Sequence, residues 1–192
     1  FGGAVNIDSG RLTLANSSAL GTGPKTLTMQ GGSRSLYLSN DITIPANVTF
    51  TVSSNSGDGT GLNNESGSNS ILGNINYSFG VPGLNISSAS GTLSIAGDVT
   101  LVTSGRTLYL GGASVTDNTI SGDIGENSSA VMPVVKQGAG KWILSGTNTY
   151  SGGTTINGGT LQLGAVGAVG SILGTVTVDS GGDGVGRGHR LG

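Results

Sequence analysis

Cysteine is absent from this sequence of 192 residues, and charged residues are scarce. The absence of cysteine excludes a disulfide framework, a thiolate nucleophile and a cysteine-ligated metal site. Asp, Glu, Lys and Arg make up 9% of the residues and the net charge is −2, so the overall charge predicts no binding to nucleic acid or to an anionic membrane surface. No apolar run approaches the length of a transmembrane helix, and we expect no membrane insertion by this segment.

Glycine, in contrast, is abundant, with 38 residues. The glycines have no collagen period, and they separate short runs in which apolar and polar residues alternate. Alternation with a period of two is a strand signal, because successive side chains leave opposite faces of a strand. The length suits one domain. The composition therefore predicts an ordered all-β fold that is rich in turns.

Residues 134–164 carry the clearest pattern in the chain. They contain three short alternating runs, which are separated by Gly, Asn and Ser. Each run is too short to bury a face by itself, whereas three such strands joined by tight turns form one coil of a solenoid, and stacked coils share a core. The predicted inward residues of this repeat are Trp142, Leu144, Ile156, Leu161 and Leu163.

The same stretch resembles a known repeat. Residues 138–146 (GAGKWILSG), 148–154 (NTYSGGT) and 156–161 (INGGTL) are similar to the passenger-associated strand repeat of bacterial autotransporters. The resemblance implies a right-handed parallel β-helix that is extracellular or displayed on the surface of a Gram-negative-type bacterium. That repeat family serves adhesins, stalks and long surface proteins alike, so the resemblance implies an architecture and no particular activity.

The spacing of the repeats predicts the size of one coil. Ile7 and Met29 are 22 positions apart, and so are Ile156 and Val178. A coil of about 22 residues gives roughly nine coils, each rising about 4.8 Å along the axis. The resulting rod is on the order of 40 Å long.

Residues 1–182 are expected to form a single β-helix domain, and residues 183–192 a basic, glycine-rich tail. Residues 53–70 interrupt the strand pattern, because they are mostly Ser, Asn and Gly and carry one Leu. We interpret them as a loop insertion that leaves the surface of the β-helix. Loops of a solenoid often carry binding functions, and an inert insertion is the alternative interpretation.

Catalysis has to be weighed, because pectin- and pectate-cleaving enzymes also use right-handed β-helices. Glycoside hydrolysis needs two facing carboxylates, and lyase chemistry needs acids clustered around Ca²⁺. No two acidic residues are adjacent or one residue apart, and the nearest pair, Asp123 and Glu126, lies in a polar turn. The single histidine, His189, lies in the tail. We predict a protein that is not an enzyme and has no cofactor or metal site.

Both termini look like incomplete coils. Residues 1–15 align without a gap on residues 150–164, and the tail stops after half a repeat. The end of a β-helix is an open row of backbone donors and acceptors, which must be capped or paired. Head-to-tail stacking of such ends grows into filaments when it does not close. The residues predicted to contribute to self-association are Phe1, Gly2, Gly3, Asp183, Arg187, His189, Arg190 and Leu191.

The sequence thus predicts a structural module that acts as a stalk or adhesin, or as a self-associating fibre subunit. The expected partner is the chain itself, through end-to-end or lateral association, or the rest of a longer passenger. One alternative is an adhesin module that binds host glycan or protein through surface loops, and a less favoured one is a polysaccharide-degrading enzyme. Because the chain begins at Phe1, without Met or a signal peptide, we expect a processed product or a piece of a longer protein.

Overall fold

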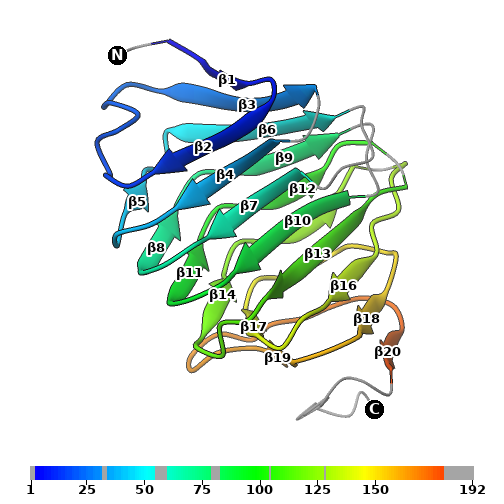
Figure 1. Ribbon diagram of the computed structural model, residues 1–192. Coiled ribbons are helices and arrows are strands. Elements are labelled where there is room, and N and C mark those ends of the chain that lie inside the picture. Colours follow the sequence, from blue (N-terminus) through cyan, green and yellow to red (C-terminus); the bar gives the residue numbers. More distant parts are fainter. Residues whose placement is uncertain are drawn as a thin grey trace.

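The computed structural model describes residues 3–31, 34–54, 60–78, 83–103, 105–127 and 129–179. Within these ranges the regular structure consists of strands, which wind into a stack of coils (Figure 1). Strand β1 (Val5–Ile7) lies at one end of the stack and β20 (Val176–Val178) at the other (Figure 1). Across the ranges that the structure describes, there is no helix with the length and apolarity that a membrane span requires.

The strands form three parallel sheets, one on each face of the stack. Sheet A contains, in order, β1, β3 (Lys25–Gly31), β6 (Val48–Ser54), β9 (Ile75–Ser78), β12 (Val99–Leu101) and β15 (Ile124–Glu126). Sheet B contains β2 (Gly10–Leu14), β4 (Arg34–Leu38), β7 (Thr60–Asn64), β10 (Gly83–Ser88), β13 (Thr107–Gly112), β16 (Val134–Lys136), β18 (Thr154–Ile156) and β20. Sheet C contains β5 (Thr43–Ile44), β8 (Ser68–Ile71), β11 (Thr92–Ile95), β14 (Asn118–Ile120), β17 (Lys141–Leu144) and β19 (Thr160–Leu163).

Neighbouring strands in each sheet belong to successive coils and pair in parallel, so the predicted parallel β-helix is confirmed. The stack has about seven turns, fewer than the predicted nine. The reason is that coil length varies along the chain. Val5 pairs with Leu27, 22 positions further on, as predicted. Ile44, however, pairs with Ile71, 27 positions further on, because the turns between strands are longer in the middle of the chain.

The core is built from ladders of stacked aliphatic side chains. In sheet B, Leu36, Leu62, Ile86 and Leu110 occupy the same inward position in four successive coils. All four side chains are fully buried. Full burial of such a side chain contributes about 1.5–3 kcal/mol relative to exposure. Stacking therefore gives each short strand a share of a continuous core that it could not form alone.

Buried asparagine side chains bond the backbone of the preceding coil. Oδ1 of Asn69 accepts a hydrogen bond of 2.8 Å from the backbone nitrogen of Ile42. Two layers further along sheet C, Oδ1 of Asn118 accepts a bond of 2.9 Å from the backbone nitrogen of Leu93. Both amide side chains are buried. They supply partners to buried backbone groups near the turns, where a missing partner would be costly.

The predicted loop insertion at residues 53–70 is wrong. Strands β7 and β8 lie within this range and continue sheets B and C in register with their neighbours. Leu62 fills an inward ladder position, and Asn64 and Asn69 fill others as buried amides that bond each other. Residues 55–59 lie outside the described part of the chain. Polar residues that form hydrogen bonds with one another inside a coil give the same sequence pattern as a surface loop.

Candidate functional site

The repeat predicted at residues 134–164 provides β16, β17, β18 and β19, near one end of the stack (Figure 1). The structure buries four of the five predicted inward residues, namely Trp142, Leu144, Ile156 and Leu161. Leu163 is 43% exposed, because β19 is the last strand of sheet C in the described ranges. Nε1 of Trp142 donates a 2.9 Å hydrogen bond to the carbonyl of Gly111, so the indole packs with its polar group satisfied.

Lys136 is a buried cation in this repeat, and sequence reasoning missed it. It ends β16 in an inward ladder position and is fully buried. Its Nζ donates to three backbone carbonyl oxygens, those of Gln137 at 3.0 Å, Gly138 at 2.9 Å and Gly158 at 2.9 Å. An ammonium group has three donors, so these three acceptors match it. Burial lowers the pKa of Lys136 to about 8.

Two tyrosines, Tyr77 and Tyr150, are buried in the core. The hydroxyl of Tyr150 lies 2.7 Å from Oγ1 of Thr154, and burial raises the pKa of Tyr150 to about 12. The hydroxyl of Tyr77 donates to Sδ of Met132 at 2.6 Å. Burial and, to a smaller extent, the charge of Glu126 raise the pKa of Tyr77. Both hydroxyls therefore stay neutral at physiological pH and act as packing groups with one polar bond each.

The acidic side chains accept hydrogen bonds from backbone nitrogens or from an amide side chain, or they form ion pairs with basic side chains. Of the eight acidic residues in the described ranges, seven have such a partner. Asp98 and Asp123 form a ladder, in which Asp98 accepts from the backbone nitrogen of Asp123 at 2.9 Å and Asp123 from that of Thr147 at 2.7 Å. Glu126 accepts from the backbone nitrogen of Ser151 at 3.0 Å. Within the same ranges, no three His, Cys, Asp or Glu residues group as metal ligands would.

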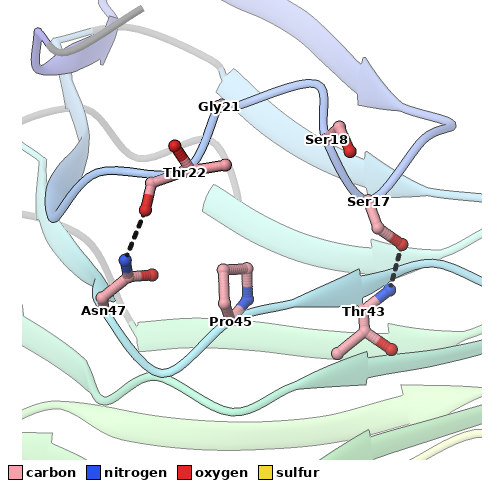
Figure 2. Close-up of a pocket in the computed structure, with 7 residues that line it drawn as sticks. All are labelled: Ser17, Ser18, Gly21, Thr22, Thr43, Pro45 and Asn47. Atoms are coloured by element: carbon pink, nitrogen blue, oxygen red, sulfur yellow. Dashed lines mark hydrogen bonds between the residues drawn. The ribbon is translucent and has the colours of Figure 1, made fainter.

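A surface pocket lies between the first two coils, where a turn that follows β2 faces the segment around β5 (Figure 2). Its volume of about 290 Å³ is near the lower limit for small-molecule sites. The backbone nitrogen of Thr43 donates to Oγ of Ser17 at 2.9 Å, and Nδ2 of Asn47 donates to the carbonyl of Thr22 at 3.0 Å. The described lining residues are neutral, namely Ser17, Ser18, Gly21, Thr22, Thr43, Pro45 and Asn47. Such a pocket offers hydroxyl and amide groups to a ligand and no charged group.

Apolar side chains are exposed at the end of the stack that carries β19 and β20. Ten large hydrophobic residues are exposed in the described part of the chain, and six of them fall within residues 163–178. These six are Leu163 (43%), Val166 (108%), Val169 (90%), Leu173 (54%), Val176 (50%) and Val178 (49%). The sequence analysis predicted self-association through residues 1–3 and through residues beyond 182, and it did not identify this apolar surface.

Of the residues predicted for self-association, the described part of the chain contains Gly3. Gly3 is exposed before β1, at the opposite end of the stack from β20. Phe1, Gly2, Asp183, Arg187, His189, Arg190 and Leu191 lie outside the described residues. Their proposed role in association therefore stays a prediction.

Comparison with known proteins points to one class of bacterial protein. Residues 134–163 match the family model of the passenger-associated-transport-repeat. A stretch of 77 residues, 40% of the chain, is 40% identical to the protein named Adhesin BmaC autotransporter from Brucella suis biovar 1 (strain 1330). The chain spans about 2% of the length of that curated relative. No solved structure matches the chain.

The match at residues 134–163 covers β16 to β19, the strands whose turns enclose Lys136 and whose inward face carries Trp142. The resemblance drawn from the residues is thus confirmed by the family model and by the relative. The chain is a parallel β-helix that carries the passenger-associated-transport repeat found in autotransporters.

Proposed function

We propose that the chain is a non-enzymatic structural module of an adhesin-like β-helix protein, displayed at the surface of a Gram-negative bacterium or released from it. The observation that carries the proposal is the repeat at residues 134–163, which folds as coils of the same stack as the other described strands. The similarity to an adhesin supports the same assignment. In this role the module acts as a stalk, or it associates end to end as a fibre subunit.

A stalk needs a stiff body that does not depend on a ligand for its shape. The three sheets run along the stack, and their hydrogen bonds join each coil to the next. Each added coil lengthens the body by about 4.8 Å. The buried asparagines and Lys136 bond the turns as well, so the coils are tied at the corners and along the strands.

Surface display can be tested on intact cells of the source bacterium. The cells are treated with a protease and then probed with an antibody raised against the purified chain. We expect the antigen to disappear from intact cells, while a cytoplasmic marker protein survives. An antigen that resists the protease until the cells are lysed would contradict the proposal.

The absence of catalysis is tested with the purified chain on a panel of acidic and neutral polysaccharides. The acids of the described ranges are largely engaged with the backbone and with other side chains, which supports a structural role for them. We expect neither new reducing ends nor the ultraviolet absorbance of unsaturated products. Product formation that is lost in an acidic-residue variant would establish an enzyme instead.

A second candidate function is binding of a host glycan, and the neutral pocket in Figure 2 favours it. Neutral sugars are recognised through hydroxyl and amide groups of the kind that line this pocket. Ser18→Trp would fill the pocket, and Thr155→Trp, on the outward face of β18, serves as the control. We expect the first variant alone to lose binding on a glycan array. Equal binding by both variants would remove this candidate.

A further inference from the structure

The turn that follows β18 contains the one Asn-Gly step of the chain, at Asn157 and Gly158. Asparagine is a thermally labile residue. Its lability is greatest before glycine, because glycine has no Cβ to keep its backbone nitrogen away from the preceding side chain. Asn157 is exposed to solvent and comes directly after Ile156, the last residue of β18 (Figure 1). The position of this step in an exposed turn therefore favours a reaction between the two residues.

The two groups that would react are free of hydrogen bonds. Among the described residues, no acceptor partners the backbone nitrogen of Gly158, and no group bonds the side-chain amide of Asn157. Gly158 is buried, and a buried N–H group without an acceptor is a costly arrangement. Ring closure on this nitrogen removes its hydrogen, so the reaction also removes the unpaired donor.

Two other exposed asparagines lack this arrangement. Asn47 precedes Val48, whose backbone nitrogen donates to the carbonyl of Pro45 at 3.0 Å. Asn74 precedes Ile75, whose backbone nitrogen donates to a carbonyl of the next coil at 2.8 Å. In both cases the nitrogen is already bonded, and a stiff β-branched side chain crowds it. Asn47 and Asn74 therefore serve as unreactive references within the same chain.

We infer that Asn157 deamidates spontaneously, with the backbone nitrogen of Gly158 as the nucleophile, and that the product weakens the contact that Lys136 makes between two coils. The nitrogen bonds to Cγ of Asn157. The side-chain nitrogen leaves as ammonia and takes the hydrogen of the attacking N–H group with it.

The cyclic imide that results is opened by one water molecule, at either of its two carbonyl groups. Opening at one carbonyl gives aspartate. Opening at the other gives isoaspartate, in which the main chain runs through Cβ and Cγ of residue 157. Water is consumed and ammonia is released, so the step needs neither an oxidant nor a reductant.

Lys136 holds the main chain on both sides of this step. Its carbonyl oxygen accepts from the backbone nitrogen of Asn157 at 2.8 Å, and its Nζ donates to the carbonyl oxygen of Gly158 at 2.9 Å. An isoaspartate adds one carbon–carbon bond, about 1.5 Å, to the main chain between these two anchors. The two hydrogen bonds can then keep their lengths only if the turn shifts.

Both products also add a negative charge to the outward face of sheet B. Ile156 pairs with Val178, so Asp179 occupies the position next to residue 157 in the following coil. Neighbouring strands lie about 4.8 Å apart, and like charges at directly adjacent positions are destabilising. The aspartate product carries this repulsion alone, whereas the isoaspartate product carries it together with a longer main chain.

Peptide mapping by mass spectrometry tests the reaction on the native chain. The purified chain is incubated at neutral pH and physiological temperature, and samples are digested over time. We expect residue 157 to gain the mass difference between a hydroxyl and an amino group, while Asn47 and Asn74 stay intact. A protein isoaspartate methyltransferase with a labelled methyl donor should detect isoaspartate in the same samples.

The matched control is Gly158→Ala. A Cβ at residue 158 would lie 3.4 Å from the carbonyl oxygen of Gly138, which is an ordinary contact, so the variant should fold, as circular dichroism can verify. The added methyl group hinders attack by the nitrogen, and the variant should lose most of the conversion at residue 157. Conversion of native Asn157 no faster than that of Asn47, or equally fast in Gly158→Ala, would overturn the proposed reaction.

A second measurement tests the effect on the coil. Ion-exchange chromatography separates the converted chains, because they carry an additional negative charge. We expect the isoaspartate form to unfold at a lower temperature than the unconverted chain. Asn157→Asp adds the same charge and keeps the normal main chain, so its loss should be smaller. Equal unfolding temperatures for the isoaspartate form and Asn157→Asp would refute the weakened contact, and no outcome here affects the protease test of surface display.

Discussion

Nζ of Lys136 donates a hydrogen bond of 2.9 Å to the carbonyl oxygen of Gly158, which belongs to the next coil of the stack. The same ammonium group bonds the carbonyls of Gln137 and Gly138 in its own coil. One buried side chain therefore ties two successive turns of the passenger-associated repeat. An apolar residue would pack in the ladder at this position, but it would leave three inward carbonyls without a donor.

We expect Lys136→Met to lower the free energy of unfolding by about 1–3 kcal/mol, because buried carbonyls lose their hydrogen-bond donor. Urea denaturation followed by circular dichroism measures the change. The control is Lys141→Met, which breaks a partly exposed ion pair of 2.6 Å with Asp117 and should cost about 0–1 kcal/mol. A smaller effect at Lys136 than at Lys141 would contradict this account of the buried ammonium.

The stability contributed by Lys136 should depend on pH. Burial lowers its pKa in the folded chain to about 8, whereas its ordinary value is 10.5. Between these values the unfolded chain binds the proton more strongly, so the free energy of unfolding contributed by this group rises with pH. The difference in stability between wild type and Lys136→Met should therefore grow from about pH 8 to pH 10. A difference that is constant or falls would show that burial does not destabilise the ammonium form.

The turn after β18 depends on glycine. Gly159 has a φ of +66°, and a Cβ there would lie 2.7 Å from Nζ of Lys136 and clash with the carbonyl of Gly140. We expect Gly159→Ala to destabilise the protein by about 2–4 kcal/mol, through backbone strain and the clash together. Gly10→Ala is the control, because Gly10 has a φ of +81° with open space around it. Strain alone, about 1–2 kcal/mol, should appear there. Equal losses of thermal stability would show that the clash is relieved without cost.

The buried amide of Asn118 should be essential to the coil that contains it. Its oxygen accepts from the backbone of Leu93, and its nitrogen donates to the carbonyl of Lys141 at 2.9 Å. Asn118→Ala leaves these groups unpaired and opens a cavity, so we expect a loss of about 2–4 kcal/mol. Asn157→Ala, at an exposed position, should change stability by less than about 0.5 kcal/mol. Similar denaturation midpoints for the two variants would contradict the structural role of the buried amide.

The fold could be predicted because apolar alternation and glycine turns are both strong in residues 134–164. Inward positions such as Trp142 and Leu161 are filled by large apolar residues, and the polar residues between them face outward. The interval 53–70 could not be predicted in the same way. There the inward residues include Asn64 and Asn69. The cost of burying these amides is offset by hydrogen bonds that form only in the folded coil.

Residues 1–15 align with residues 150–164 in sequence, but the two segments lie on different sheets of the β-helix. Ile7 aligns with Ile156, yet Ile7 belongs to sheet A and Ile156 to sheet B. A strand, a glycine turn and a second strand can occupy either corner of the coil, because each corner joins two strands of similar length. Sequence similarity between repeats therefore identifies the unit of the coil but not the face on which it lies.

The buried position of Lys136 and the exposed apolar residues of β20 could not be predicted from the sequence. Lys136 follows the inward phase of β16, and the glycines after it provide inward carbonyls, so the signal was present, but a lysine is usually assigned to the surface. The exposure of Val176 and Val178 depends on whether another coil lies above them. That is a property of the whole stack, and no local pattern in β20 contains it.

The direction of the hydrogen bonds has a mechanical consequence. In all three sheets the bonds join successive coils and so run along the axis of the stack. A pulling force between the two ends acts parallel to these hydrogen bonds. The coils would therefore separate one after another. Each coil that opens would release about 24 residues, or roughly 80 Å of extended chain. A tether built this way would lengthen stepwise under tension and rewind when the tension falls, while the coils that remain closed keep their core.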